Sequence, residues 1–159
     1  MAKAPETTNV MRLLEQAGIE YIPHYYDPEE TKGTSVAALL GQSEECVFKT
    51  LVTEANTREH FVFVIPVGET LDLKKAAKAA GVKSIAMIRQ KDLLPLTGYV
   101  RGGCSPIGMK KPFDTTLDGS AEHLDTVTVS AGKIGWQVEL TPGDLAALTG
   151  ARFSPVTTE

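Results

Sequence analysis

Residues 47–67 read VFKTLVTEANTREHFVFVIPV, and this stretch decides the fold. Two apolar, β-rich runs, 47–52 and 61–67, flank a short polar segment with turn-forming residues. This pattern predicts an antiparallel hairpin. Successive side chains of a strand point to opposite faces, and both faces of the first run are mostly apolar. We therefore expect the hairpin at the centre of the protein, with Lys49 or Thr50 directed toward the interior.

Helical and β-rich segments follow one another on both sides of this hairpin. Hairpins and longer connections occur together, which favours a mixed α/β fold with one strongly bent sheet or a partly closed barrel, surrounded by helices. Residues 1–159 are expected to form a single domain. The expected helices cover 9–17, 35–40, 71–80, 91–96 and 142–149, and the expected strands cover 21–26, 47–52, 61–67, 113–117, 126–130, 136–140 and 152–156. Thr7 or Thr8 is expected to cap the first helix, and Thr70 the third.

The composition is that of an ordinary globular protein, with 42% hydrophobic and 23% charged residues. No segment is apolar for long enough to span a membrane, and residues 1–8 lack the apolar core of a secretory signal. The two cysteines, Cys46 and Cys104, lie far apart and form no CxxC pair. These features predict a reduced, cytoplasmic protein with no membrane contact.

The net charge of −4 hides an uneven distribution along the chain. Residues 73–111 contain nine Lys or Arg and one acidic residue, Asp92, whereas the segments on either side are acidic. A local excess of this size attracts phosphates within roughly 10 Å, the screening length at 0.1 M salt. Taken alone, the excess is more typical of solvated lysines on helix surfaces. No helix-turn-helix pattern accompanies it, so DNA binding is not expected.

The most informative loop is Gly102-Gly103-Cys104-Ser105-Pro106-Ile107-Gly108. Adjacent glycines allow close backbone approach and expose consecutive N–H donors, which suits an anion or a developing oxyanion. Ser105 and Pro106 would fix the turn that follows. A phosphate-binding P-loop is excluded because Met109 stands where that motif needs lysine. A tight structural turn remains the alternative to a binding loop.

The polar residues in the predicted core point to chemistry without a cofactor. A buried lysine is costly, so Lys49 is either functional or extends from the strand end into solvent. His24, His60 and His123 lack metal-ligand spacing, and no GxSxG motif is present. Cys104 beside two glycines could be a nucleophile if a base comes from elsewhere in the fold. We therefore predict no metal and no organic cofactor.

Four stretches resemble the YbaK family of free-standing aminoacyl-tRNA deacylases, which are related to the editing insertion domain of bacterial prolyl-tRNA synthetase. The resemblance covers nearly the whole chain, and the order and spacing of the stretches make it specific. The stretches are Phe48-Lys49-Thr50-Leu51, Leu73-Lys74-Lys75-Ala76-Ala77, Thr97-Gly98-Tyr99 with Gly102–Gly108, and Val129-Ser130-Ala131-Gly132-Lys133.

This resemblance implies a mixed α/β fold and the release of cysteine mischarged onto proline tRNA. It implies catalytic roles for Lys49, Gly102 and Gly103. The residues matched to substrate binding are Tyr26, Thr50, Ser105, Pro106, Ser130 and Gly132. Combined with these motifs, the basic segment is expected to grip the tRNA backbone through Lys74, Lys75, Arg101, Lys110 and Lys111. One departure is Lys32, where the family's cysteine-specific members often carry an aromatic residue.

In the mechanism implied by the family, the substrate's own thiol attacks its ester carbonyl and forms a cyclic thiolactone. The protein then supplies positioning and electrostatics: N–H groups of Gly102 and Gly103 would polarise the carbonyl, and Lys49 would hold a phosphate or the carbonyl side. The expected partners are the acceptor end of proline tRNA and prolyl-tRNA synthetase. Two alternatives stay open, namely a deacylase for another mischarged tRNA such as Ala-tRNA(Pro), and a non-catalytic tRNA-binding regulatory module.

Overall fold

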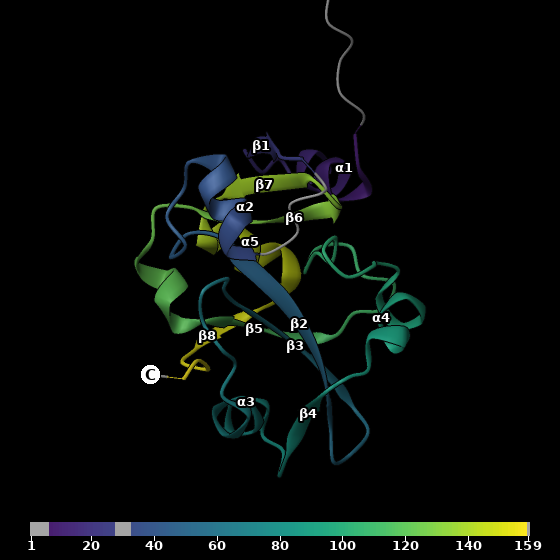
Figure 1. The fold of residues 1–159 in the computed structure, drawn as a ribbon. Helices are drawn as coiled ribbons and strands as arrows, with labels where there is room; N and C mark the ends of the chain where they lie inside the picture. The colour runs from purple at the N-terminus through teal and green to yellow at the C-terminus, as the bar shows by residue number, and fades with distance from the viewer. Residues whose placement is uncertain (1–6, 28–32, 159) are drawn as a thin grey trace, which may run out of the picture.

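The computed structural model describes residues 7–27 and 33–158, which form two β-sheets with helices around them (Figure 1). The five-stranded sheet has the order β4-β2-β3-β5-β8, and the three-stranded sheet has the order β1-β7-β6. The strands are β1 (Ile22–Tyr25), β2 (Phe48–Ala55), β3 (His60–Pro66), β4 (Ile85–Met87), β5 (Asp114–Asp118), β6 (Val127–Lys133), β7 (Trp136–Leu140) and β8 (Arg152–Ser154). The helices are α1 (Asn9–Gln16), α2 (Gly33–Leu40), α3 (Leu73–Ala80), α4 (Gln90–Thr97), the 3₁₀ helix η1 (Gly119–His123) and α5 (Pro142–Thr149).

The predicted hairpin is confirmed and forms the centre of the larger sheet. β2 and β3 pair antiparallel from Phe48↔Pro66 to Glu54↔His60, whereas β5 pairs parallel to β3 and β8 pairs parallel to β5. The mixed α/β fold is therefore confirmed. The sheets do not close into a barrel; an isolated parallel bridge between Val47 and Thr128 joins them.

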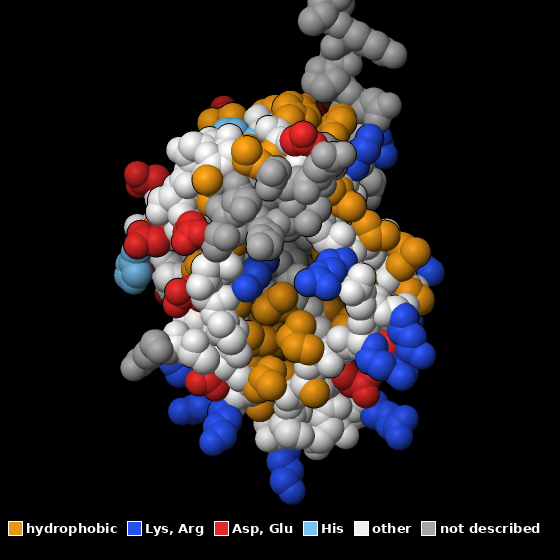
Figure 2. Space-filling model, in the orientation of Figure 1, with side chains coloured by type: hydrophobic (Ala, Val, Ile, Leu, Met, Phe, Trp, Pro, Cys, Tyr) orange, Lys and Arg blue, Asp and Glu red, His pale blue; other side chains and the backbone are white. Residues whose placement is uncertain are grey.

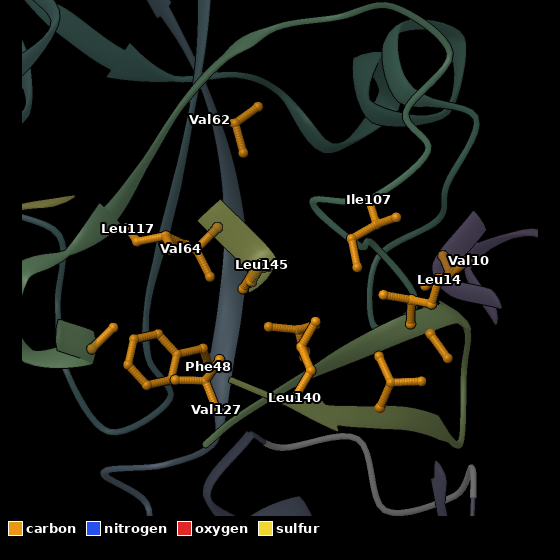
Figure 3. Close-up of a cluster of buried hydrophobic side chains, with 14 of the residues drawn as sticks. Val10, Leu14, Phe48, Val62, Val64, Ile107, Leu117, Val127, Leu140 and Leu145 are labelled. Atoms are coloured by element: carbon orange, nitrogen blue, oxygen red, sulfur yellow. The ribbon is translucent and has the colours of Figure 1, made fainter. Parts of the chain in front are cut away.

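Apolar side chains cover both faces of the central hairpin, as its sequence predicts. One face carries Phe48, Val52, Val62 and Val64, which pack with α1, α5 and the three-stranded sheet in the largest core cluster (Figure 3). The other face carries residues such as Phe63, which pack with α3 in a second cluster. The site described below lies where these two layers meet the smaller sheet.

Helix starts follow capping chemistry, with one correction to the prediction. Thr8 caps α1, as expected, by accepting a hydrogen bond from Met11 N. The helix α3 is capped by Asp72 and not by Thr70, because the Asp72 carboxylate accepts from both Lys74 N and Lys75 N. A charged acceptor at this position also complements the helix dipole. No described helix is long and apolar enough to cross a membrane.

Candidate functional site

The strands β2 and β6 separate immediately beyond the bridge between Val47 and Thr128. At the bridge, Thr128 N donates to Cys46 O at 2.8 Å. Side chains two residues further along each strand point to the same face as the bridge residues. Lys49 and Ser130 are those residues, so they flank the place where the two parallel strands part.

The segment that includes α2 covers the same face near the bridge. Val47 packs with Ala37 of α2, and Thr128 Oγ1 donates to Gln42 Oε1 at 2.8 Å just after that helix. Lys49 is thereby half-buried although it lies at the edge of the protein core. Lys32, whose identity departs from the family pattern, lies outside the described residues.

The backbone of Thr50 faces the opening between the separated strands. Residue pairs of an antiparallel ladder alternate between bonding the partner strand and facing away from it. Val67 N donates to Val47 O, so Val47 and every second residue after it bond β3, while Val52 O accepts from Ile88 N on the other edge. The strand β4 pairs with that edge from Thr53 to Ala55. The N–H and C=O of Thr50 therefore point between β6 and β4.

The Thr50 hydroxyl is also unusual. Among the residues that the structure describes, Thr50 Oγ1 is the buried side-chain oxygen or nitrogen that has no hydrogen-bond partner. Buried hydroxyls are normally paired, so each exception needs a reason. A ligand that supplies the missing partner is one such reason.

Burial shapes the electrostatics of Lys49. Desolvation lowers the pKa of its ammonium group, and the nearby Glu69 carboxylate opposes this shift. A partly desolvated ammonium interacts more strongly with an incoming anion or polarised carbonyl than a fully hydrated one. Lys49 is therefore suited to electrostatic binding.

The two glycines of the loop have different tasks. Gly103 N donates to Val100 O at 3.0 Å, which closes a β-turn, and Gly102 has a φ of 87° at the third position of this turn. A positive φ at this position defines a type II turn and favours glycine. The N–H of Gly103 is thus engaged within the turn. The N–H of Gly102 takes no part in the turn's closing bond, so it is the better candidate for the expected donor to a substrate carbonyl.

The glycine turn is packed against the β6–β7 connection. A Cβ on Gly103 would lie 3.1 Å from Ile134 N and 3.4 Å from the carbonyl carbon of Lys133. Both atoms belong to backbone, so a side chain at this position would force the two segments apart. Glycine at position 103 therefore allows the loop to approach β6.

Ser105 and Pro106 are buried and support the loop from inside. Ser105 Oγ accepts from Ile107 N at 3.2 Å. Ile107 is 2% exposed and lies on the same side of the main core cluster as Val10 and Leu14 of α1 (Figure 3). The structure thus shows a supporting role for Ser105.

The remaining expected substrate residues also meet at the β6–β7 connection. Tyr26 N donates to Gly135 O at 2.9 Å, and Ser130 Oγ accepts from Gly132 N at 3.1 Å. Gly132 has a φ of 92° and lies in the β-bulge between Ser130 and Lys133. The structure therefore brings Tyr26, Ser130 and Gly132 together with the glycine turn, and the bridge at Thr128 connects β6 to the strand that carries Lys49.

The expected tRNA-binding residues are not equally accessible. Lys74, Lys110 and Lys111 are exposed, and exposed Arg101 donates through Nη1 to Gln90 Oε1 at 3.2 Å. Lys75 is half-buried, and its ammonium donates to Thr157 O at 2.9 Å, which ties α3 to the last residues of the chain. Figure 2 shows Lys and Arg side chains around a central hydrophobic patch on one face of the protein.

A polar network behind the site was not predicted from the sequence. Glu139 Oε1 hydrogen-bonds with His24 Nε2 at 2.8 Å and accepts from Gln42 Nε2 at 3.0 Å, and Glu139 Oε2 accepts from Thr126 Oγ1. The hydrogen bond from Thr126 and the bond and charge of His24 lower the pKa of Glu139, against the effect of burial. This carboxylate connects β1, β7 and the two segments that precede β2 and β6.

Two cavities in the described part of the protein lie elsewhere. One of about 560 Å³ borders β4 and includes Glu54, Arg89 and Asp92, and one of about 450 Å³ lies between α3 and β4. Neither is lined by Lys49, Ser130 or the glycine turn. We place the candidate site at the β2–β6 separation because the polar groups converge there.

Comparisons with known proteins identify the family of this chain. The aminoacyl-tRNA editing domain family matches residues 28–148. The proposed Cys-tRNA(Pro)/Cys-tRNA(Cys) deacylase EbsC of Enterococcus faecalis is 45% identical over 159 residues, which cover 99% of this chain and 97% of that protein.

Two solved structures share the fold. A hypothetical protein is 25% identical with a TM-score of 0.86, over 94% of this chain and 99% of its own. A proposed trans-editing enzyme for prolyl-tRNA synthetase is 22% identical with a TM-score of 0.83, over 97% of this chain and 100% of its own. On the extent of the family match and of the 45% identity, the chain belongs to the aminoacyl-tRNA editing domain family.

Proposed function

We propose that this protein is a deacylase that removes mischarged cysteine from proline tRNA. One observation carries the proposal. Lys49 and Ser130 flank the separation of β2 and β6, and the Gly102–Gly103 turn packs on the β6–β7 connection that follows Ser130. The name of the 45% identical relative supports cysteine as the amino acid. The proposed substrate is a mischarged tRNA, which takes part in protein synthesis, so we expect the enzyme to act in the cytoplasm.

In the proposed reaction, the protein positions the substrate and polarises its ester. The Lys49 ammonium and the Gly102 N–H both approach the aminoacyl ester, and the Thr50 N–H, which points between β6 and β4, provides a further hydrogen bond. Preorganised donors of this kind stabilise the charge that develops on the carbonyl oxygen. This role requires a charged lysine, so Lys49 acts as an electrostatic group and not as a base.

The substrate supplies the nucleophile. The cysteine sulfur attacks the ester carbonyl carbon, a carbon–sulfur bond forms, and the bond from that carbon to the ribose oxygen breaks. The thiol proton ends on the ribose oxygen, so the products are a cyclic thiolactone and tRNA with a free terminal hydroxyl. Because the protein holds the thiol close to the carbonyl, the reaction gains rate from proximity and needs no nucleophile from the protein.

The tRNA backbone is proposed to contact the exposed cations Lys74, Lys110, Lys111 and Arg101. Each phosphate contact adds affinity through counterion release, whatever the base sequence. Lys75 is a weaker candidate because its ammonium already donates to Thr157 O. Prolyl-tRNA synthetase is proposed as a partner on the basis of the shared fold with a proposed trans-editing enzyme for that synthetase.

The test is release of labelled cysteine from Cys-tRNA(Pro), with Ala-tRNA(Pro) assayed in parallel. Wild type should release cysteine quickly and leave alanine in place, because alanine has no thiol. Lys49→Ala should slow release by at least 100-fold, the effect expected when a charge-stabilising donor is lost. Lys83→Ala removes an exposed lysine outside the site and should release cysteine at the wild-type rate.

The other outcomes decide between the alternatives. Preferential release of alanine would keep the deacylase and move its specificity to Ala-tRNA(Pro). Binding of tRNA with no release of either amino acid would show a non-catalytic module and reject the enzyme.

A further inference from the structure

We propose that Tyr99 is a positioning residue that holds the Gly102 N–H in place for the reaction. This inference rests on the proposed deacylase function. Its basis is the position of Tyr99 between the end of the glycine-rich loop and the bulge of β6.

The first observation is that the loop is closed at its base. Lys110 N donates to Thr97 O at 2.9 Å, so residues 98–109 form a loop that starts and ends at the C-terminus of α4. Thr97 is 1% exposed, and its hydroxyl accepts from Tyr99 N at 3.0 Å and donates to Leu93 O at 2.8 Å. The backbone N–H of Tyr99 is thereby fixed to the C-terminal end of α4.

The second observation is a hydrogen bond across the loop. Tyr99 Oη donates to the carbonyl oxygen of Ile107, eight residues further along the chain. This bond ties the beginning of the loop to its end, and the Gly102–Gly103 turn lies between these two points. Burial raises the pKa of Tyr99 to about 12, so the phenol keeps its proton at ordinary assay pH.

The third observation is that the phenol ring touches the neighbouring strand. A Cβ on Gly132 would lie 3.0 Å from Tyr99 Cε1, and a Cβ on Gly108 would lie 3.2 Å from Tyr99 Oη. Both glycines have positive φ values, 92° and 72°. A side chain at Gly132 would crowd the tyrosine ring, and one at Gly108 would crowd the tyrosine hydroxyl as well as Leu13, whose Cδ1 would lie 2.8 Å from the new Cβ.

These contacts connect the loop to the part of β6 that carries Ser130. The glycine turn itself approaches the backbone at Ile134, and Tyr99 fixes the other end of the loop against Gly132. Loss of the hydroxyl would free the Ile107 carbonyl and let the turn move relative to β6. Catalysis by an oriented N–H depends steeply on its position, so such movement should reduce the rate more than the affinity.

The experiment compares Tyr99→Phe with wild type and with Tyr21→Phe. Tyr21 is a matched control because its hydroxyl also donates a hydrogen bond, to Glu15 Oε2 at 2.7 Å, far along the chain from the glycine loop. Tyr99→Phe should lower kcat for Cys-tRNA(Pro) about tenfold, the effect of one net hydrogen bond, and leave KM within twofold. Tyr21→Phe should leave both constants unchanged.

A second measurement follows the turn itself. Hydrogen exchange of the Gly103 amide, which donates to Val100 O, should be about tenfold faster in Tyr99→Phe and unchanged in Tyr21→Phe. Unchanged exchange, or a kcat equal to that of wild type, would overturn the inference. A lower melting temperature with unchanged Gly103 exchange would also overturn it, because Tyr99 would then serve stability alone. If wild type releases no cysteine, the deacylase proposal and the catalytic part of this inference fail together, whereas a Tyr99 failure in an active enzyme affects this inference alone.

Discussion

Two neighbouring residues of β2, Lys49 and Thr50, lower the free energy of unfolding of the protein. Lys49 is half-buried on one face of the strand, where desolvation lowers its pKa. Thr50 carries a buried hydroxyl without a partner on the other. Unpaired polar groups in an interior lower the free energy of unfolding. Sites for ligands commonly retain such groups because the ligand provides the missing interactions.

Lys49→Met should therefore separate activity from stability. The variant should lose deacylation and melt about 2 °C higher than wild type at pH 7, because methionine fills the site without a desolvated charge. The difference should shrink as pH rises from the lowered native pKa toward the unfolded value, since native Lys49 releases its proton first. Melting curves at pH 7 and pH 10 measure this. A variant that is less stable than wild type at pH 7 would contradict it.

Thr50→Val tests the unpaired hydroxyl. The free energy of unfolding should rise by about 0.5–1 kcal/mol, because the substitution removes a buried polar group that has no bond to lose. Thr53→Val is the matched control in the same strand, since Thr53 Oγ1 is buried and donates to Phe61 O at 2.8 Å. That variant should lose about 1–2 kcal/mol. Urea unfolding of both proteins would show opposite signs, and equal losses would reject the account of Thr50.

At the scale of elements, the site depends on how two sheets and their connections are held. Glu139 on β7 bonds side chains from β1 and from the segments before β2 and β6. Two of these partners lie next to the bridge at which β2 and β6 part: Gln42 also accepts from Thr128 Oγ1, and Thr126 is two residues before Thr128. The network therefore helps to fix the position of the three-stranded sheet relative to β2, the strand that carries Lys49.

Glu139→Gln should weaken this hydrogen-bond network and lower the free energy of unfolding. An amide replaces one acceptor oxygen by a donor, so one partner loses its bond, and we expect a loss of about 1–2 kcal/mol at pH 7. Because the native pKa of Glu139 is lowered, its contribution is full above the unfolded value and disappears as pH falls through the native one. Urea unfolding at pH 7 and below pH 4 measures this. A difference that is the same at both pH values would exclude the carboxylate as its cause.

The sequence predicted elements whose signals are local. The hairpin at 47–67 follows from two apolar, β-rich runs on either side of a polar turn, and the start of α1 follows from the capping threonine Thr8. The three-residue strand β4 was missed because it is too short for a periodic pattern. The start of α3 was placed at Thr70 since both Thr70 and Asp72 are capping residues, and their backbone geometry decides between them.

The candidate site was predictable in its residue types and less so in its contacts. Adjacent glycines indicated a special loop, yet their sequence does not show that the Gly103 N–H closes a turn to Val100 O. The partners of Glu139 are similarly hidden, because His24 is separated from it by 115 residues. Contacts of this kind depend on the tertiary fold and leave no periodic signal in the chain.

Across the molecule as a whole, the charges are unevenly distributed along the chain. The basic segment 73–111 contributes exposed lysines around a hydrophobic patch, whereas the total charge is −4 (Figure 2). An overall negative charge disfavours non-specific attachment to nucleic acid, and a local positive region still binds phosphates at short range. We expect modest affinity that depends strongly on ionic strength.

Substitutions in the basic segment should distinguish phosphate contacts from structural lysines. Lys110→Ala and Lys111→Ala should each reduce the slope of log affinity against log salt concentration by about 0.7–0.9. Lys75→Ala should leave this slope nearly unchanged and lower the melting temperature, because its ammonium holds Thr157 O. Measurements of tRNA binding from about 50 to about 200 mM salt give these slopes. If the slopes of all three variants equal that of wild type, the tRNA must bind another surface of the protein.

The isolated bridge between Val47 and Thr128 has a consequence for divergence within the family. The two sheets share one hydrophobic core, and the candidate site lies at the seam where this isolated bridge joins them. A change in the angle at that seam therefore requires a change in the shared core, for example in side-chain volume at Phe48 or Val129. We therefore expect substitutions in this core to alter the amino-acid preference of the site even where its lining residues are unchanged.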